Sequence, residues 1–132
     1  MKVYGTNEIK NIALIGSKGS GKTTLAEAML FECGVIKRRG TIDSGNTVCD
    51  YFPVEKEYGY RVFSTVCYAE FLNKKLNVID CPGGDDFVGS AITALNVTDT
   101  GVLLIDAQYG VEVGSQNIFR VTEKIKKPVI FA

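Results

Sequence analysis

The chain has 132 residues, of which 45% are hydrophobic, and its 15 Lys and Arg residues balance 15 Asp and Glu residues to a formal net charge of zero. This length fits one domain and is enough to bury a core. A neutral chain carries no bulk signal for nucleic acid, so we expect no direct sequence-specific nucleic-acid binding. We interpret the basic run Lys37-Arg38-Arg39 as a solvated stretch of a loop.

The cysteine spacing and the hydropathy pattern argue against a zinc site and against a membrane span. No histidine is present, and no two cysteines form a C-x-x-C pair, so the usual Cys/His zinc site has no support. No apolar run approaches the roughly 18 residues of a membrane span, and no charged-then-apolar leader opens the chain. We therefore expect a cytoplasmic protein without a membrane partner, in which the cysteines are reduced thiols: Cys33, Cys49, Cys67 and Cys81.

The first predicted element is an apolar strand from about Ile9 to Ile15. It leads into Gly16-Ser17-Lys18-Gly19-Ser20-Gly21-Lys22-Thr23, which matches the pattern G-x-x-x-x-G-K-[ST] at every fixed position. The residues that follow have helical propensity and spacing. We expect a helix that starts at Lys22 or Thr23 and ends near Cys33-Gly34, where glycine suits the end of a helix.

A glycine-rich loop between a strand and a helix is the arrangement that binds a polyphosphate. Glycines let backbone N–H groups approach the phosphates, and the helix N-terminus adds a partial positive charge. Lys22 can reach the outer phosphates, and the Thr23 hydroxyl can ligate Mg²⁺. The alternative is a Gly/Ser-rich turn before an ordinary helix, although a chance match would not usually fall between a strand and a helix.

The remaining elements alternate in type. A long irregular stretch from Val35 to about Tyr58 is expected to be functional or mobile. After it we expect, in order, a hairpin of strands Tyr60 to Phe71 and Leu76 to Asp80 around an Asn73-Lys74 turn, a helix from Phe87-Val88 to Leu95-Asn96, an apolar strand from Gly101 to Asp106, a helix from Val113 to Lys126, and a strand that starts at Pro128. This order predicts an α/β fold with a mostly parallel sheet, one antiparallel edge hairpin, and helices on both faces.

A second motif, Asp80-Cys81-Pro82-Gly83, follows a predicted strand. An Asp at a strand end can hold Mg²⁺ through a water, and a Gly three residues later can offer its N–H to a terminal phosphate. The alternative is an Asp that only begins a proline turn. We therefore expect Thr23 and Asp80 on the metal side, and a set of phosphate-binding residues: Gly16, Ser17, Lys18, Gly19, Ser20, Gly21, Lys22, Thr23, Thr24 and Gly83.

With these motifs in place, the chain resembles the elongation factor G family of translational GTPases. The resemblance rests on Asn11-Ile12-Ala13-Leu14-Ile15-Gly16, on Asp50-Tyr51 to Glu57-x-Gly59, on Asp80-x-Pro82-Gly83-x-x-Asp86-Phe87, and on Asp106-Ala107-x-x-Gly110-Val111-Glu112. It implies a phosphate-loop NTPase fold of the Ras-like G-domain type, binding of GTP or GDP with Mg²⁺, and contact with the ribosome through the full-length factor during translocation. Switch I would cover Val35 to Tyr60 and switch II Cys81 to about Gly89.

The resemblance also implies that residues 1–132 are a G domain that is incomplete at its C-terminal end. The family's guanine-reading Asn-Lys-x-Asp motif would follow Ala132, with a further strand and helix. Guanine specificity is thus implied by the family alone. Without that strand, the segment Val129-Ile130-Phe131 would be an exposed sheet edge, and we expect the fragment to self-associate or to bind nucleotide more weakly.

This sequence departs from the family pattern at several positions. Gly84 stands where the family has the histidine that positions the attacking water, and Arg61 stands where switch I has the threonine that closes on Mg²⁺. A guanidinium donates hydrogen bonds only and cannot ligate a metal. A register slip to Ser64 or Thr65 would supply a hydroxyl. Ser17 and Gly19 replace the usual histidine and aspartate but keep the loop pattern.

We therefore assign no catalytic residue and expect an elongation-factor-G-like GTP-binding domain with weak hydrolysis. One alternative is a fully active ribosome-stimulated GTPase, in which Arg61 or a ribosomal group replaces the missing ones. Another is a different phosphate-loop ATPase or kinase, although the chain offers no recognisable acceptor site or lid. The last is a ribosome-binding module in which the nucleotide is only structural.

Overall fold

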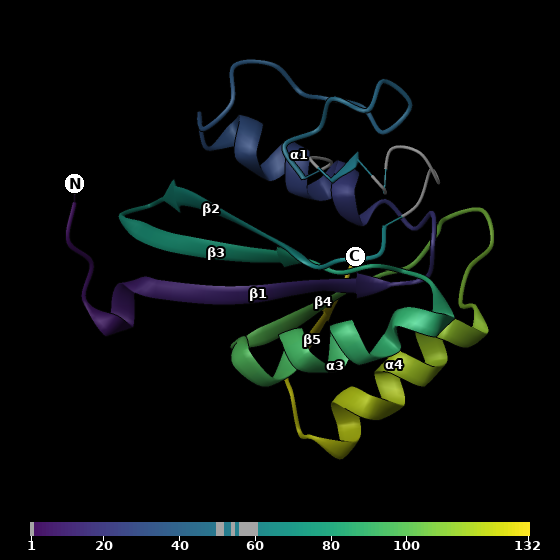
Figure 1. Cartoon of the computed structure of the whole chain (residues 1–132). Helices are drawn as coiled ribbons and strands as arrows, with labels where there is room; N and C mark the ends of the chain where they lie inside the picture. The colour runs from purple at the N-terminus through teal and green to yellow at the C-terminus, as the bar shows by residue number, and fades with distance from the viewer. Residues whose placement is uncertain (1, 50–51, 54, 56–60) are drawn as a thin grey trace.

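The computed structural model describes residues 2–49, 52–53, 55 and 61–132 (Figure 1). Four residues that carry the family resemblance lie outside the described residues, namely Asp50, Tyr51, Glu57 and Gly59, and so does Tyr60, the predicted start of the hairpin. The elements are the 3₁₀ turns η1 (Thr6–Glu8) and η2 (Asp85–Phe87), the helices α1 (Lys22–Glu32), α3 (Val88–Val97) and α4 (Val113–Lys124), and the strands β1 (Ile9–Gly16), β2 (Thr65–Phe71), β3 (Lys74–Asp80), β4 (Thr100–Leu104) and β5 (Val129–Phe131).

The strands form one five-stranded sheet in the order β2-β3-β1-β4-β5. Among the described strands, the β2–β3 pair alone is antiparallel, and the other three pairs are parallel. Helix α1 lies on one side of the sheet, and α3 and α4 lie on the other (Figure 1). The predicted α/β architecture with an antiparallel edge hairpin is confirmed.

Alternation along β1 divides the core into two layers. Ala13 and Ile15 belong to the cluster that Leu95 and Ile118 complete from α3 and α4. Leu14 points to the opposite face and joins a second cluster with residues of α1. All three β1 side chains are fully buried, so β1 is the centre of the fold and fixes the loop that leaves its C-terminal end.

The register of β1 against β3 positions the later site. Leu14 lies opposite Asp80, the last residue of β3. The C-terminal ends of parallel strands meet at one edge of a sheet, which is where α/β proteins bind ligands. The loop after β1 and the turn after Asp80 therefore lie side by side.

Two boundaries of the predicted hairpin are wrong. The second strand begins at Thr65, because β3 ends opposite it at Asp80 and the ladder has no partner to continue along. In addition, the N–H groups of Val62 and Phe63 donate to the Glu55 carboxylate and are not available to a strand. The turn comprises Leu72 and Asn73, both with positive φ (46° and 61°), so Lys74 already belongs to β3.

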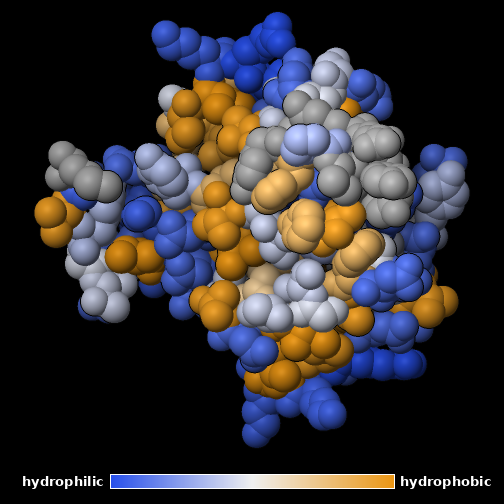
Figure 2. Space-filling view, in the orientation of Figure 1, coloured by the Kyte–Doolittle hydropathy of each residue, from blue (hydrophilic) through white to orange (hydrophobic). Residues whose placement is uncertain are grey.

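The surface mixes hydrophilic residues with separate hydrophobic patches on the face that Figure 2 shows. Within the described part of the chain, no helix has the length and apolar character that a membrane crossing requires. Large exposed apolar side chains include Ile130 (58% exposed) and Phe131 (60%) on β5. Strand β5 is the last strand of the sheet and pairs with β4.

We expect the 132-residue chain to self-associate through β5, because an apolar edge strand is a template for pairing. Ile130→Lys should lower the apparent mass in light scattering at high protein concentration. Val97→Lys is the matched control, since Val97 is 66% exposed at the end of α3 but does not lie on a sheet edge. A parent chain that stays monomeric at every concentration would contradict this expectation.

Candidate functional site

The glycine-rich loop joins β1 to α1 and has the backbone that its sequence predicts. Positive φ values occur at Gly16, Gly19 and Gly21. At Gly16, with φ of 137°, a Cβ would lie 2.5 Å from the Leu104 carbonyl oxygen, so glycine is required there by both conformation and space. The loop therefore packs directly on the end of β4.

Lys22 lies inside this loop with only 6% of its surface exposed. Its Nζ donates to the carbonyl oxygens of Gly16 (2.9 Å) and Ser17 (2.6 Å) and lies 3.4 Å from Ser20 Oγ. Burial lowers the pKa of Lys22, and the Asp80 carboxylate opposes that shift. A phosphate oxygen in the loop would give this buried ammonium an anionic partner.

The turn after β3 touches the loop through Gly83. A Cβ on Gly83 would lie 2.4 Å from Lys22 Nζ and 2.8 Å from both Lys18 N and Ser17 O. Only a glycine backbone fits this close to the loop. The structure thus brings together the two motifs that the sequence separates by a hairpin and a long irregular stretch.

Gly84 differs from its neighbour. Its φ of −77° and ψ of 142° are open to any residue. A Cβ there would lie 3.2 Å from Phe87 Cδ2, at the edge of a side chain that can shift slightly. The backbone therefore does not require glycine at the position of the family's histidine.

A cavity of about 610 Å³ opens at this edge of the sheet. Most of the expected phosphate-binding residues line it, and Arg61 and Glu55 line it as well: Lys18, Gly19, Gly21, Lys22, Thr23, Thr24 and Gly83. Gly16 and Ser17 lie instead beside a smaller cavity next to Gly83 and Gly84. Ser20 stands next to Lys22 Nζ.

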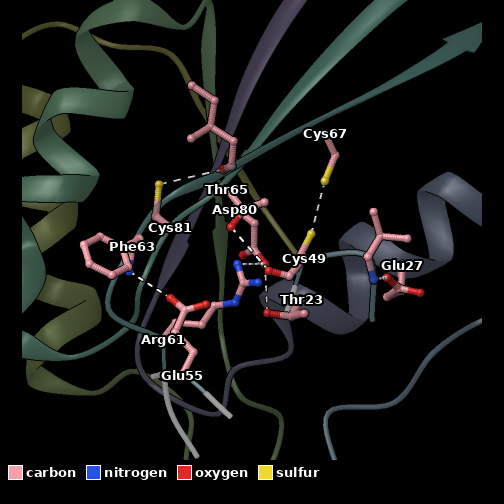
Figure 3. A network of polar contacts seen from close by, with 12 residues as sticks. Thr23, Glu27, Cys49, Glu55, Arg61, Phe63, Thr65, Cys67, Asp80 and Cys81 are labelled. Atoms are coloured by element: carbon pink, nitrogen blue, oxygen red, sulfur yellow. Dashed lines mark hydrogen bonds and ion pairs between the residues drawn. The ribbon is translucent and has the colours of Figure 1, made fainter. Parts of the chain in front are cut away.

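The two residues expected on the metal side are in direct contact. Thr23 Oγ1 donates to Asp80 Oδ2 at 2.8 Å, and the Asp80 side chain is fully buried. The Nη1 atom of Arg61 lies 2.9 Å from the same carboxylate oxygen, and the Arg61 side chain is 10% exposed. Figure 3 shows the guanidinium beside both Thr23 and Asp80.

This donor set does not fit a divalent cation. The carboxylate oxygen accepts from a hydroxyl and from a guanidinium, and a metal ion here would lie against a fixed positive charge. Within residues 2–49, 52–53, 55 and 61–132, no group of three or more His, Cys, Asp or Glu side chains could hold a metal ion. Thr23 and Asp80 therefore lie together, and a cation of the protein itself stands beside them.

Two buried glutamates that the sequence did not single out hold backbone amides, and one of them, Glu55, lines the cavity. Glu27 of α1 accepts hydrogen bonds from the N–H groups of Gly40 (2.9 Å) and Val48, which fixes the irregular stretch against the helix. A carboxylate one turn after Thr23, on the buried face of α1, was a usable signal. Glu55 accepts from Val62 N and Phe63 N, and no local pattern could have shown this, because its partners are backbone groups of another segment.

Further contacts join the loop and the irregular stretch to their neighbours. Ser17 Oγ lies 2.9 Å from Ser115 Oγ at the start of α4, another contact that the sequence did not predict. The Thr65 hydroxyl, considered above for the switch I threonine, donates to the Cys49 carbonyl oxygen at 3.4 Å. Thr65 therefore points to Cys49. Arg61, which precedes β2, lines the cavity and forms the ion pair with Asp80.

The cysteines have no disulfide or zinc role among the described residues. Cys49 Sγ and Cys67 Sγ lie 3.2 Å apart in the buried layer below α1. The hydrogen bond to Cys67, together with burial, raises the pKa of Cys49. Burial raises the pKa of Cys81 to about 12, which keeps this thiol protonated next to Asp80.

The contrast between the two glycines gives a testable prediction. Gly83→Ala should destabilise the protein by about 1–3 kcal/mol, because the new methyl group overlaps Lys22 and the loop backbone. Gly84→Ala is the matched control and should change stability by less than about 1 kcal/mol, since its backbone suits alanine. Urea unfolding curves measure both, and equal losses would contradict the packing described here.

Comparison with known proteins places this site in a family. The family model described as "Elongation factor Tu GTP binding domain" matches residues 7–132. The mitochondrial ribosome-releasing factor 2 of Candida dubliniensis is 36% identical over 124 residues, which are 94% of this chain and 15% of the relative. The tetracycline resistance protein TetS of Listeria monocytogenes is 35% identical over 94% of this chain and 19% of the relative.

A crystal structure of a Thermus thermophilus protein has the same fold, with a TM-score of 0.88 and 36% identity over 94% of this chain and 19% of that one. The chain thus spans less than a fifth of the length of these proteins. The phosphate loop, the Asp80 turn and this agreement lead to one conclusion: the chain belongs to the elongation factor Tu GTP-binding domain family and is similar, as its motifs predicted, to the elongation-factor-G-like members.

Proposed function

We propose that this chain binds guanine nucleotide as the GTP-binding domain of an elongation-factor-G-like translation factor, which acts in ribosomal translocation and hydrolyses GTP slowly. The observation that carries the proposal is the packing of Gly83 against Lys22 and the loop. This packing joins two separate motifs into one candidate phosphate-binding site. A simple Gly/Ser-rich turn would not need this second, tightly fitted backbone.

The phosphate side of the proposal rests on the residues around the cavity. Loop N–H groups and Lys22 would hold the phosphates, and the Gly83 N–H would reach the terminal one. Guanine specificity rests on the family relationship, because the motifs present are phosphate-binding motifs and do not read the base. The same relationship disfavours a general ATPase or kinase.

We infer slow hydrolysis from the residues at positions 84 and 61. Gly84 has no side chain to orient an attacking water, and the Arg61 guanidinium cannot ligate a metal ion. One observation favours the alternative of a fully active, ribosome-stimulated GTPase. Arg61 lines the cavity, and a guanidinium near a transferring phosphoryl group can stabilise its transition state.

The role of the whole protein is proposed from its relatives. The names of two relatives refer to ribosome release and to tetracycline resistance, and each relative is several times longer than this chain. We infer a ribosome partner for the full-length factor. The expected cytoplasmic location stays a prediction, because the name of one relative places that protein in mitochondria.

Binding is tested by Lys22→Ala in the full-length protein. Loss of the buried ammonium should weaken GDP affinity at least about tenfold in calorimetry, because charged hydrogen bonds to phosphate are lost. Lys124→Ala is the control, since Lys124 is exposed at the far end of α4. Unchanged affinity in a folded Lys22→Ala protein, or ADP binding as tight as GDP binding, would contradict the proposal.

Hydrolysis is tested by restoring the family's groups. Removal of a group that positions water or stabilises charge costs about 10²–10⁴ in rate in comparable enzymes. The double variant Gly84→His with Arg61→Thr should therefore raise ribosome-stimulated GTP turnover in the full-length protein. Each single change should do less, because both act on one transition state. If the parent protein already turns over GTP as fast as a histidine-containing factor, the fully active alternative is correct.

A further inference from the structure

The position of Arg61 carries an inference about the cation that the nucleotide needs. Asp80 is fully buried at the end of β3, and a buried carboxylate requires a positive partner or several hydrogen bonds. Arg61 Nη1 supplies a positive partner at 2.9 Å, on the oxygen that also accepts from Thr23. A cationic group of the chain therefore stands where the sequence predicts a metal.

The guanidinium is held in this position from the backbone. The two residues that follow Arg61 donate their N–H groups to Glu55 Oε1, at 3.0 Å from Val62 and 2.9 Å from Phe63. Glu55 is itself only 4% exposed, so this anchor is part of the folded structure. A side chain that leaves a fixed backbone and ends in a buried ion pair has little conformational freedom left to lose on binding.

The same guanidinium lines the cavity that the phosphate loop lines. Arg61 shares this cavity with Lys22, Thr23 and Gly83, so a phosphate bound by the loop would lie within the neighbourhood of Arg61. Guanidinium groups bind phosphate oxygens strongly through their fixed fork of donors. Asp80 would orient this fork, and a guanidinium with five N–H donors can serve a carboxylate and a phosphate together.

We propose that Arg61 replaces Mg²⁺ as the cation at the nucleotide phosphates, so that this domain binds guanine nucleotide without a divalent metal. The inference rests on the proposed function of nucleotide binding and concerns only the source of positive charge at the phosphates. It assigns to Arg61 a binding role, whereas Thr23 and Asp80 hold the guanidinium in place.

The test compares GDP affinity by calorimetry in excess Mg²⁺ and in EDTA, with the full-length protein. For the parent protein the two affinities should agree within about threefold. Arg61→Thr removes the guanidinium and leaves the oxygens of Thr23 and Asp80 to a metal, so EDTA should weaken its GDP affinity about tenfold or more, the value of one charged hydrogen bond. Arg120→Thr is the matched control, because Arg120 is exposed on α4 and should leave the affinities in both buffers unchanged.

The outcomes separate this inference from the proposed function. A parent protein that binds GDP in Mg²⁺ but loses about tenfold or more in EDTA overturns the role of Arg61 and leaves nucleotide binding intact. No GDP binding in either buffer overturns the proposed function and this inference with it. If Arg61→Thr does not fold, the parent protein decides by itself, since its GDP affinities in excess Mg²⁺ and in EDTA should still agree within about threefold.

Discussion

The buried carboxylate of Asp80 is the interaction on which the site depends. It lies at the end of β3, next to the central strand β1, where water cannot compensate its charge. Thr23, from the start of α1, and Arg61, from the segment before β2, both donate to it. One charged group therefore joins the helix, the sheet and the segment before β2, and loss of the guanidinium would remove the ion pair of a buried negative charge.

The irregular stretch is attached to this framework by side chains and not by a strand ladder. Glu27 holds the N–H groups of Gly40 and Val48, and Glu55 holds those of Val62 and Phe63. Each carboxylate thus replaces backbone pairing that a sheet would otherwise supply. Cys49, which follows Val48, is fully buried in the core layer below α1, so this part of the stretch is also fixed by the core and not by Glu27 alone.

Local patterns predicted the parts of this structure that local chemistry determines. The phosphate loop, the helix after it and the alternation of strands and helices follow from spacing and propensity, and the structure agrees. The start of β2 was not predictable, because it depends on Glu55 capturing two backbone amides and on where β3 ends. The ion pair of Arg61 with Asp80 was missed for the same reason: a sequence shows a charge but not the distant group that the fold brings beside it.

Of the two adjacent glycines, the fold requires one and not the other. Gly83 must be glycine, because any Cβ would meet Lys22 and the loop. Gly84 has ordinary extended backbone, so the fold would accept a larger residue with a small shift of Phe87. Backbone strain therefore does not explain why position 84 lacks a histidine. Arg61 lines the larger cavity and Gly84 the smaller one, and Gly83 lines both, so the two departures change the chemistry on the two sides of one turn that the fold keeps in place.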